Sequence, residues 1–224
     1  MKLSKRTLQI LKNFSAINQS VVFFPGNIIK TVVPGNTQDF FSAATVEETF
    51  TVECAIYDIR RFLNCLDLFD DPEIEFDVNF ATISDGKNTL RYVYVDKDII
   101  DSPDYSRSPK VKTLLAEFKL AGEHIKTAIK ASSLLGINDV ELVGDADGNV
   151  RLIAADTEAE SDNFSLLIEE DVDYNGEFKS KYSIDKLRLL IEDDYTVRLS
   201  TSVLTEFVGD AGVVYHHGGL IETA

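Results

Sequence analysis

The spacing of apolar residues predicts four helices, because in four segments they recur at intervals of three and four positions. In the first segment Ile10, Leu11 and Phe14 share one face, and polar side chains occupy the other. The predicted helices are 3–17, 58–69, 122–135 and 184–191. In each of them Lys or Arg lies on the face opposite to the apolar stripe.

Short apolar or alternating runs predict strands over most of the remaining chain. Several runs flank a turn signal, such as Pro25-Gly26, Asp85-Gly86 or Asp147-Gly148. The predicted strands are 21–24, 27–33, 49–57, 73–83, 88–95, 139–144, 149–155, 163–170, 177–183, 195–200, 202–209 and 213–218. Few helices and many hairpin-linked strands indicate an α+β fold with antiparallel sheets.

Two pairs of segments match at nearly the same distance along the chain. YDIRRFLNCL (57–66) aligns with YSIDKLRLLI (182–191), and AINQSVVFF (16–24) aligns with GINDVELVG (136–144). The order of predicted elements also agrees, which indicates a duplicated domain. Chance similarity between short apolar segments is the alternative.

A segment between the halves, 96–110, holds two prolines and four aspartates and has no periodicity, as is typical of a linker. We predict an N-terminal domain at 1–96, a linker at 97–110 and a C-terminal domain at 111–224. A chain of 224 residues is long enough for two cores.

The composition limits the cellular compartments in which the protein is expected. No window approaches the roughly 18 apolar residues of a membrane span, and the basic amphipathic start is not a signal peptide. Cys54 and Cys65 are too few for a disulfide framework. We therefore expect a soluble protein in a reducing compartment, with both cysteines serving in packing.

Charge is distributed unevenly. The formal net charge is −16, yet the segments 2–17, 58–69, 122–135 and 184–191 contain ten Lys and Arg against four acids. The rest of the chain holds 12 Lys and Arg against 34 acids. Solvated helix faces are the simple explanation, but such faces favour Glu as much as Lys, and these segments contain one Glu. A cationic helical surface on an acidic body suits a phosphate backbone without base readout.

Other functional motifs are weak. DADGN (145–149) resembles the start of a calcium loop, but its glycine is misplaced and a hairpin turn explains it better. His216 and His217 are adjacent on a predicted strand and point to opposite faces, so they make a poor metal pair. No phosphate loop or nucleophile–base arrangement is recognisable. We predict no catalytic residues, no metal and no cofactor.

Three motifs carry a resemblance to a known family. These are the N-terminal MKLSK with LKNF and Ile17-Asn18, the segment VECAIYDIRRFL, and DDPEI at the start of the next strand. They resemble the sliding clamps of T-even-type bacteriophages, most clearly over residues 1–80.

The resemblance implies a DNA-clamp fold of two duplicated domains, each with two helices packed on antiparallel sheets. Three subunits would close head to tail into a homotrimeric ring of six domains around duplex DNA. Such a ring tethers the replicative DNA polymerase and gives it processivity. It is not an enzyme. An ATP-dependent clamp loader opens it, and it also supports phage late transcription. The implied location is the cytoplasm of the infected bacterial host.

The resemblance also assigns residues. The expected DNA-facing side chains are Lys5, Arg6, Lys12, Arg60, Arg61, Lys126, Lys130, Lys186 and Arg188, with Lys2 as a further candidate. The expected subunit interface pairs strand 88–95 with strand 163–170 and includes Arg91, Tyr92, Leu166, Ile168, Glu169 and Glu170. The expected pocket for partner peptides includes Ile99, Ile100, Val213 and Tyr215.

Two other classes of function stay open at this point. One is a soluble acidic α+β enzyme with an unrecognised active site. The other is a monomeric acidic protein that mimics DNA, although a mimic has no use for a cationic helical surface.

Overall fold

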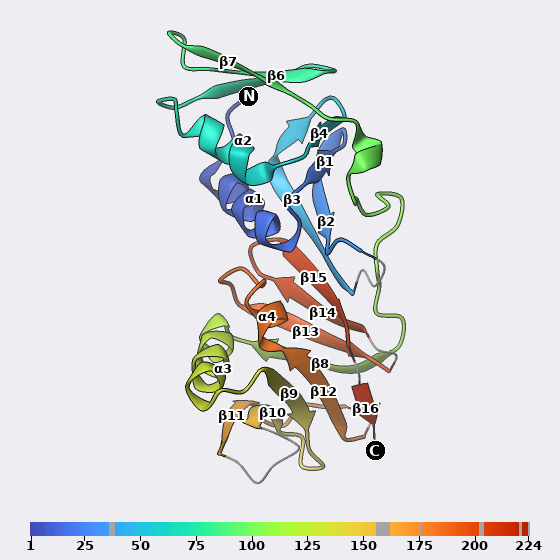
Figure 1. Ribbon diagram of the computed structural model, residues 1–224. Helices are drawn as coiled ribbons and strands as arrows, with labels where there is room; N and C mark the ends of the chain where they lie inside the picture. Colours follow the sequence, from blue (N-terminus) through green and yellow to red (C-terminus); the bar gives the residue numbers. More distant parts are fainter. Residues whose placement is uncertain (36–38, 156–161, 175, 202–203, 220, 224) are drawn as a thin grey trace. The chain divides into compact units, whose positions relative to one another are not determined.

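The computed structural model describes residues 1–35, 39–155, 162–174, 176–201, 204–219 and 221–223. It divides into two compact units, 1–108 and 109–224. Within the described residues each unit contains two α-helices and antiparallel strands (Figure 1). The predicted α+β class is confirmed.

The helices lie where the periodicity predicts them. They are α1 (Lys5–Ile17), α2 (Ile59–Leu66), α3 (Gly122–Leu135) and α4 (Ile184–Leu187). The largest difference is at α4, whose predicted extent reached residue 191. There the backbone tightens into three-residue turns, because Leu189 N–H donates to the Lys186 carbonyl at 3.1 Å and Leu190 N–H to the Leu187 carbonyl at 3.2 Å.

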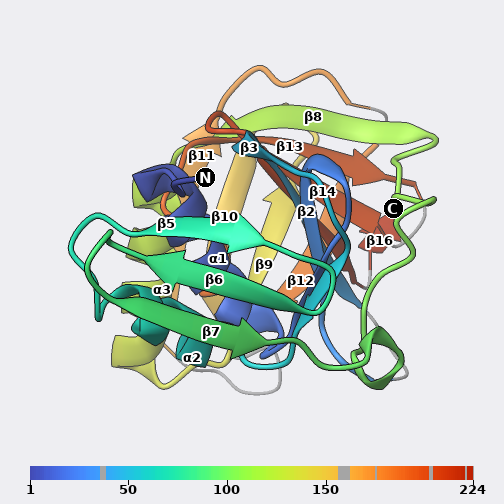
Figure 2. The same ribbon diagram turned by 90° about the horizontal axis from the view of Figure 1, so that it is seen from above.

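Seven strands belong to the N-terminal unit. They are β1 (Val21–Phe23), β2 (Gly26–Val32), β3 (Phe40–Phe50), β4 (Cys54–Ile56), β5 (Glu73–Phe76), β6 (Phe80–Ser84) and β7 (Thr89–Val93). β1 pairs with β4, β2 pairs with β3, and β5, β6 and β7 form a sheet in that order (Figure 2).

Two strand predictions in this unit are wrong. The predicted strand 49–57 spans a break, because β3 ends at Phe50 and β4 begins at Cys54. Most of β3 was not predicted. The predicted strand 73–83 is likewise two strands, β5 and β6, which face each other across a turn in which Asp77 N–H donates to the Phe80 carbonyl at 2.9 Å.

The strands of the C-terminal unit are β8 (Leu114–Leu120), β9 (Asp139–Gly144), β10 (Val150–Ala155), β11 (Asn163–Glu169), β12 (Phe178–Ser183), β13 (Tyr195–Ser200), β14 (Leu204–Gly209), β15 (Val213–Gly218) and β16 (Ile221–Thr223). One sheet has the order β11-β10-β9-β12-β16. The other pairings run β8-β13-β14-β15. β8 and β16 were not predicted, and the first two residues of the predicted strand 202–209 lie outside the described residues.

The two units repeat one topology. In each, a helix is followed by four strands, and a short second helix precedes three strands that pair in sequence. β8 pairs with β13 in the C-terminal unit, and in the N-terminal unit Met1 takes that place by exchanging backbone hydrogen bonds with Ile74 in β5. The order of elements agrees with the predicted duplication, although β9 pairs with both β10 and β12 whereas the described β1 pairs with β4 alone.

Apolar packing holds each helix on its sheets. In the N-terminal unit the rings of Phe23 and Phe50 stack at 4.5 Å between centroids, and Phe76 meets Phe50 edge-on at 5.4 Å. Phe62 of α2 packs edge-on against Tyr92 of β7 at 5.2 Å. Such aromatic contacts stabilise beyond simple area burial, and they fix which face of α2 remains in water.

Residues after β7 are fastened to the N-terminal unit. The Lys30 ammonium is almost fully buried and donates to the Tyr105 carbonyl, the Arg107 carbonyl and the Ser108 hydroxyl, each at 3.0 Å. Burial lowers the pKa of Lys30, against an opposing effect of Asp104. The Tyr105 hydroxyl also donates to the Val22 carbonyl at 2.8 Å. These contacts tie most of the segment that the sequence indicated as a linker to the first unit.

Candidate nucleic-acid interface

α1 exposes its cations to solvent because its opposite face is buried in the core. Ile10, Leu11 and Phe14 are at most 1% exposed, so the opposite side of the helix faces water. Lys5 and Lys12 on that side are exposed, and Arg6 is half-buried. α1 itself carries no acidic residue.

The start of α1 is held by a small polar cluster. The Ser4 hydroxyl caps the helix by accepting from Thr7 N–H at 3.1 Å. The Glu48 carboxylate of β3 accepts from Ser4 N–H and from the Thr7 hydroxyl. Burial of Glu48 acts to raise its pKa, but these hydrogen bonds outweigh it and the pKa is lowered. The cluster therefore holds the first turn of α1, which carries Lys5, in place.

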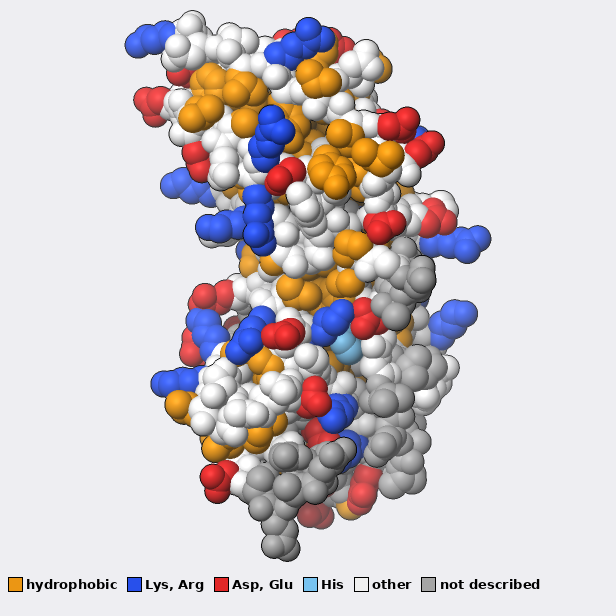
Figure 3. Space-filling view, in the orientation of Figure 1, with side chains coloured by type: hydrophobic (Ala, Val, Ile, Leu, Met, Phe, Trp, Pro, Cys, Tyr) orange, Lys and Arg blue, Asp and Glu red, His pale blue; other side chains and the backbone are white. Residues whose placement is uncertain are grey.

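α2 begins at its N-cap Asp58, whose carboxylate accepts from Arg61 N–H at 2.9 Å. Ile59, Phe62 and Leu66 are buried, which leaves Arg60 and Arg61 exposed. α1 and α2 lie side by side (Figure 1), and Arg60 Nε donates to the Ser15 hydroxyl of α1 at 3.4 Å. Lys and Arg side chains project from the side of this unit on which the two helices lie (Figure 3).

The C-terminal unit presents its cations differently. Lys126 and Lys130 of α3 are exposed, but Lys126 Nζ lies 3.0 Å from Glu123 Oε1 and 2.5 Å from Glu192 Oε1. The hydrogen bond to Glu192, followed by that to Glu123, raises the pKa of Lys126. Two carboxylates therefore compete with any anionic ligand for this ammonium group.

The second helix of this unit follows the same pattern. Arg188, just after α4, lies 3.0 Å from the Asp185 carboxylate and donates to the Ser133 hydroxyl of α3 at 3.1 Å. Lys186 is half-buried. Among the described residues, no carboxylate lies within ion-pair distance of Lys5, Lys12, Arg60, Arg61 or Lys130. Most of the predicted DNA-facing residues are exposed on or beside the four helices, and four of these five cations without a carboxylate partner lie in the N-terminal unit.

The predicted interface strands are both edge strands of their sheets. β7 pairs only with β6 in its three-stranded sheet, and β11 ends the five-stranded sheet. Arg91 is exposed, with its guanidinium carbon 3.9 Å from the centre of the Phe80 ring. Tyr92 points the other way, onto Phe62.

On β11, Leu166, Ile168 and Glu169 are partly exposed. One oxygen of Glu169 accepts from Lys119 N–H at 2.6 Å, and Glu170 is exposed just beyond the strand.

The four residues expected to line a peptide pocket have different surroundings. Ile99 is 62% exposed, whereas Ile100 is buried against Val22 and Ala55. Val213 and Tyr215 are completely buried. The Tyr215 hydroxyl accepts from Ile191 N–H at 3.1 Å, so this side chain is engaged within its own unit. Only Ile99 of the four offers a large apolar surface to a partner.

Comparisons with known proteins decide the family. A family model described as DNA polymerase processivity factor matches residues 2–99. The sliding clamp of Vibrio phage KVP40 is 31% identical over 212 residues, covering 93% of this chain and 95% of that protein. The chain belongs to the sliding clamp family. The predicted resemblance to clamps of T-even-type phages is confirmed.

Further sliding clamps agree over shorter spans. That of Escherichia phage RB69 is 32% identical over 67% of this chain and 64% of its own length, and that of Enterobacteria phage T4 is 30% identical over 63% of this chain and 61% of its own length. Because these relatives are phage proteins, the interpretation of the chain as a bacteriophage clamp is supported.

Solved structures confirm the clamp fold. Helicobacter pylori beta clamp, in a complex with a DNA ligase peptide, has a TM-score of 0.72 at 17% identity, over 98% of this chain. The chain spans 64% of the length of that clamp. A. fulgidus PCNA, bound to the C-terminal region of FEN-1, has a TM-score of 0.71 at 17% identity and is covered over 98% of its length.

Family membership also answers the question of catalysis. Sliding clamps are processivity factors of DNA polymerases and not enzymes, so the enzyme alternative is set aside. Among the described residues, no group of three or more His, Cys, Asp or Glu side chains is placed to hold a metal ion. None of the helices in the described part of the chain is long and apolar enough to cross a membrane.

The sequence did not reveal which clamp cations are neutralised. Glu192 is 66 positions from Lys126, and no local pattern links them. Asp185 could have been found, since it lies three residues before Arg188 on the predicted helix.

Proposed function

We propose that three copies of this sliding clamp close head to tail into a ring of six domains around duplex DNA. In the ring, the faces of α1, α2, α3 and α4 that carry cations line the hole. Lys5, Lys12, Arg60 and Arg61 make the strongest contacts with phosphates, because no described carboxylate competes for them. The unpaired cationic face of α1 is the observation that carries this proposal.

Non-specific contact with phosphates suits a clamp that slides. Lys and Arg on helices contact the DNA backbone through charge, without reading bases. The acids lie mainly outside the four helices, so most of the body repels DNA. Lys2 is held by Asp71 and contributes less than the five cations without a described carboxylate partner.

β7 of one subunit and β11 of the next form the proposed subunit interface. Both present unpaired backbone groups, and an edge strand is stabilised when another strand adds to it. A head-to-tail contact of this kind must close into a ring or continue into a filament. Arg91, Tyr92, Leu166, Ile168 and Glu169 would then lie at or beside the contact.

The remaining assignments belong to the same proposal. The ring tethers the replicative DNA polymerase, is opened by an ATP-dependent clamp loader and supports late transcription in the cytoplasm of an infected bacterium. Partner peptides dock beside Ile99, near the end of the N-terminal unit. Helicobacter pylori beta clamp and A. fulgidus PCNA, which share the fold, were each solved with a segment of another protein, which supports peptide capture.

Light scattering across a dilution series tests the ring. A species of three times the 25.0-kDa chain mass is expected. Val93→Asp should dissociate it, because Val93 is 64% exposed on β7 and the new charge would meet the acidic end of β11. Val78→Asp is the matched control, since Val78 is 69% exposed but lies outside β7. A monomer at every concentration would contradict the proposal.

A further inference from the structure

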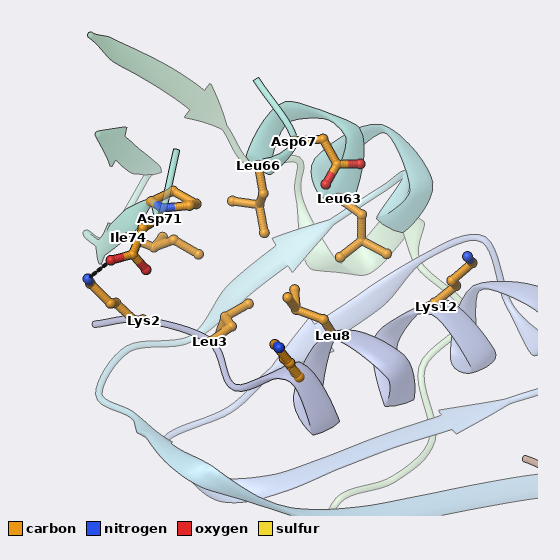
Figure 4. A pocket seen from close by; sticks show the side chains of 11 residues that line it. Lys2, Leu3, Leu8, Lys12, Leu63, Leu66, Asp67, Asp71 and Ile74 are labelled. Atoms are coloured by element: carbon orange, nitrogen blue, oxygen red, sulfur yellow. Dashed lines mark hydrogen bonds and ion pairs between the residues drawn. The ribbon is translucent and has the colours of Figure 1, made fainter. Parts of the chain in front are cut away.

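A cavity of about 400 Å³ opens between α1, α2 and β5 of the N-terminal unit (Figure 4). Its floor is apolar and is formed by Leu3, Leu8, Leu63, Leu66, Pro72 and Ile74. In the close-up, Leu3 and Leu8 on the α1 side point toward Leu63 and Leu66 of α2. The volume is within the range of sites that bind small ligands or single side chains of a partner.

The α1 rim of this cavity is cationic. Lys5 and Lys12 lie three residues before and four residues after Leu8, so all three share one face of the helix. Both lysines are exposed and have no carboxylate partner among the described residues. At one end of the cavity Lys2 and Asp71 neutralise each other. Asp67 lies on the opposite rim, at the end of α2.

The corresponding place in the C-terminal unit is tied together by polar contacts. Gly122 N–H at the start of α3 donates to the Asp194 carboxylate at 2.8 Å. Lys126 is bridged by Glu123 and Glu192. In the N-terminal unit Met1 and Lys2 bond to Ile74 and Asp71 at one end of the cavity, but no described ion pair spans Lys5 or Lys12, and the half-buried side chains of Leu8 and Leu63 face the opening.

A DNA backbone over this face would use the lysines but would leave the leucines uncovered. A ligand that satisfies both must combine apolar side chains with negative charge. We propose that the cavity binds a short peptide that places leucine-like side chains on the floor and acidic side chains on Lys5 and Lys12. The partner is therefore a protein with an exposed acidic, leucine-containing segment.

This inference rests on the proposed function in one respect. Lys5 and Lys12 are also the proposed phosphate contacts, so the peptide and duplex DNA compete for them. The partner then occupies the clamp when DNA is absent and is displaced when the duplex enters. Because duplex DNA displaces the peptide, the partner binds clamps that are free of DNA and not those that encircle it.

The experiment uses the full-length chain with ¹³C-labelled leucine methyl groups and the synthetic peptide DELLDE. Without DNA, the methyl signals of Leu3, Leu8, Leu63 and Leu66 are expected to shift on titration. Peptides DEAADE and KKLLKK test the apolar and the acidic requirement separately, and each should bind at least about tenfold more weakly. A short duplex added afterwards should reverse the shifts.

Leu63→Trp fills the cavity without removing a charge and should raise the Kd for DELLDE by about tenfold or more, which is the effect of losing one buried apolar contact. Leu68→Trp is the matched control, because Leu68 is 71% exposed and does not line the cavity. Absence of shifts, or equal binding by both variants, overturns the proposal even if the ring and its DNA contact are intact. Shifts that the duplex fails to reverse refute the competition and leave the peptide site in place.

Discussion

The two units of this clamp share one topology but present their helices differently. α1 carries three cations and no acid, and Lys5 and Lys12 lack a described carboxylate partner. α3 carries two cations and Glu123, and Lys126 is bridged by two carboxylates. The difference shows that a duplicated fold can keep its order of elements while its surface charge diverges.

The physical reason is that fold and charge depend on different positions. Core residues such as Phe14 in α1 and Ala128 in α3 are almost fully buried and determine how each helix packs. Exposed positions are free to change, so the charge available to DNA can become concentrated in one half. We therefore expect most of the phosphate contact in the N-terminal unit.

The largest expected effect is on processive synthesis. Lys5→Gln, Lys12→Gln and Arg61→Gln together should reduce it at least about tenfold more than Lys126→Gln, Lys130→Gln and Arg188→Gln, because the first set removes three cations without a described carboxylate partner and the second set removes one. Primer extension past the length that the polymerase reaches alone measures this. Each variant loses the same formal charge, so the second set controls for the first. Equal losses of processivity would show that the ion pairs within the C-terminal unit do not weaken its contact with DNA.

A smaller effect in the opposite direction is expected when Lys126 is released. Glu123→Gln and Glu192→Gln remove both of its carboxylate partners and should strengthen binding to duplex DNA several-fold. Glu73→Gln and Glu75→Gln on β5 make the same change in net charge away from Lys126. If both pairs strengthen binding equally, overall charge is responsible and the ion pairs are not.

The smallest effect concerns the anchoring of α1. Glu48→Gln should lower the free energy of unfolding at pH 7 by about 1 kcal/mol, because two hydrogen bonds to a charged acceptor become weaker. Chemical denaturation of the full chain measures this loss.

The pH dependence gives a separate check. Since the pKa of Glu48 is lowered in the folded state, its contribution is present above the unfolded pKa and is lost as the pH falls through the folded pKa. Wild type should therefore lose more stability than Glu48→Gln on acidification below about pH 5. If the free energy of unfolding of both proteins falls equally with pH, the negative charge of Glu48 does not contribute to stability.

The helices and their cationic faces could be predicted from sequence, because a period of 3.6 residues specifies both the buried and the exposed side. β3 was largely missed: its central run SAATVEET mixes small and polar residues, although Ala44 and Val46 are buried. Alternation suggested a strand across Thr51–Glu53, but alternation does not show where a chain turns.

Features that join distant segments could not be predicted. The partner of Lys126 is Glu192, and the cavity between α1 and α2 requires both helices to be placed in space. The period of a strand also does not tell which of its faces another layer covers. The resemblance suggested Val213 and Tyr215 for a peptide pocket, and in the structure both are buried.

The salt dependence of duplex binding tests the central claim most directly. The slope of log affinity against log salt decreases in magnitude by about 0.9 for each phosphate contact that is lost. For Lys5→Gln, Lys12→Gln and Arg61→Gln we predict a much larger decrease than for Lys126→Gln, Lys130→Gln and Arg188→Gln. An equal decrease, or none for the first set, would contradict a DNA-facing helix layer concentrated in the N-terminal unit.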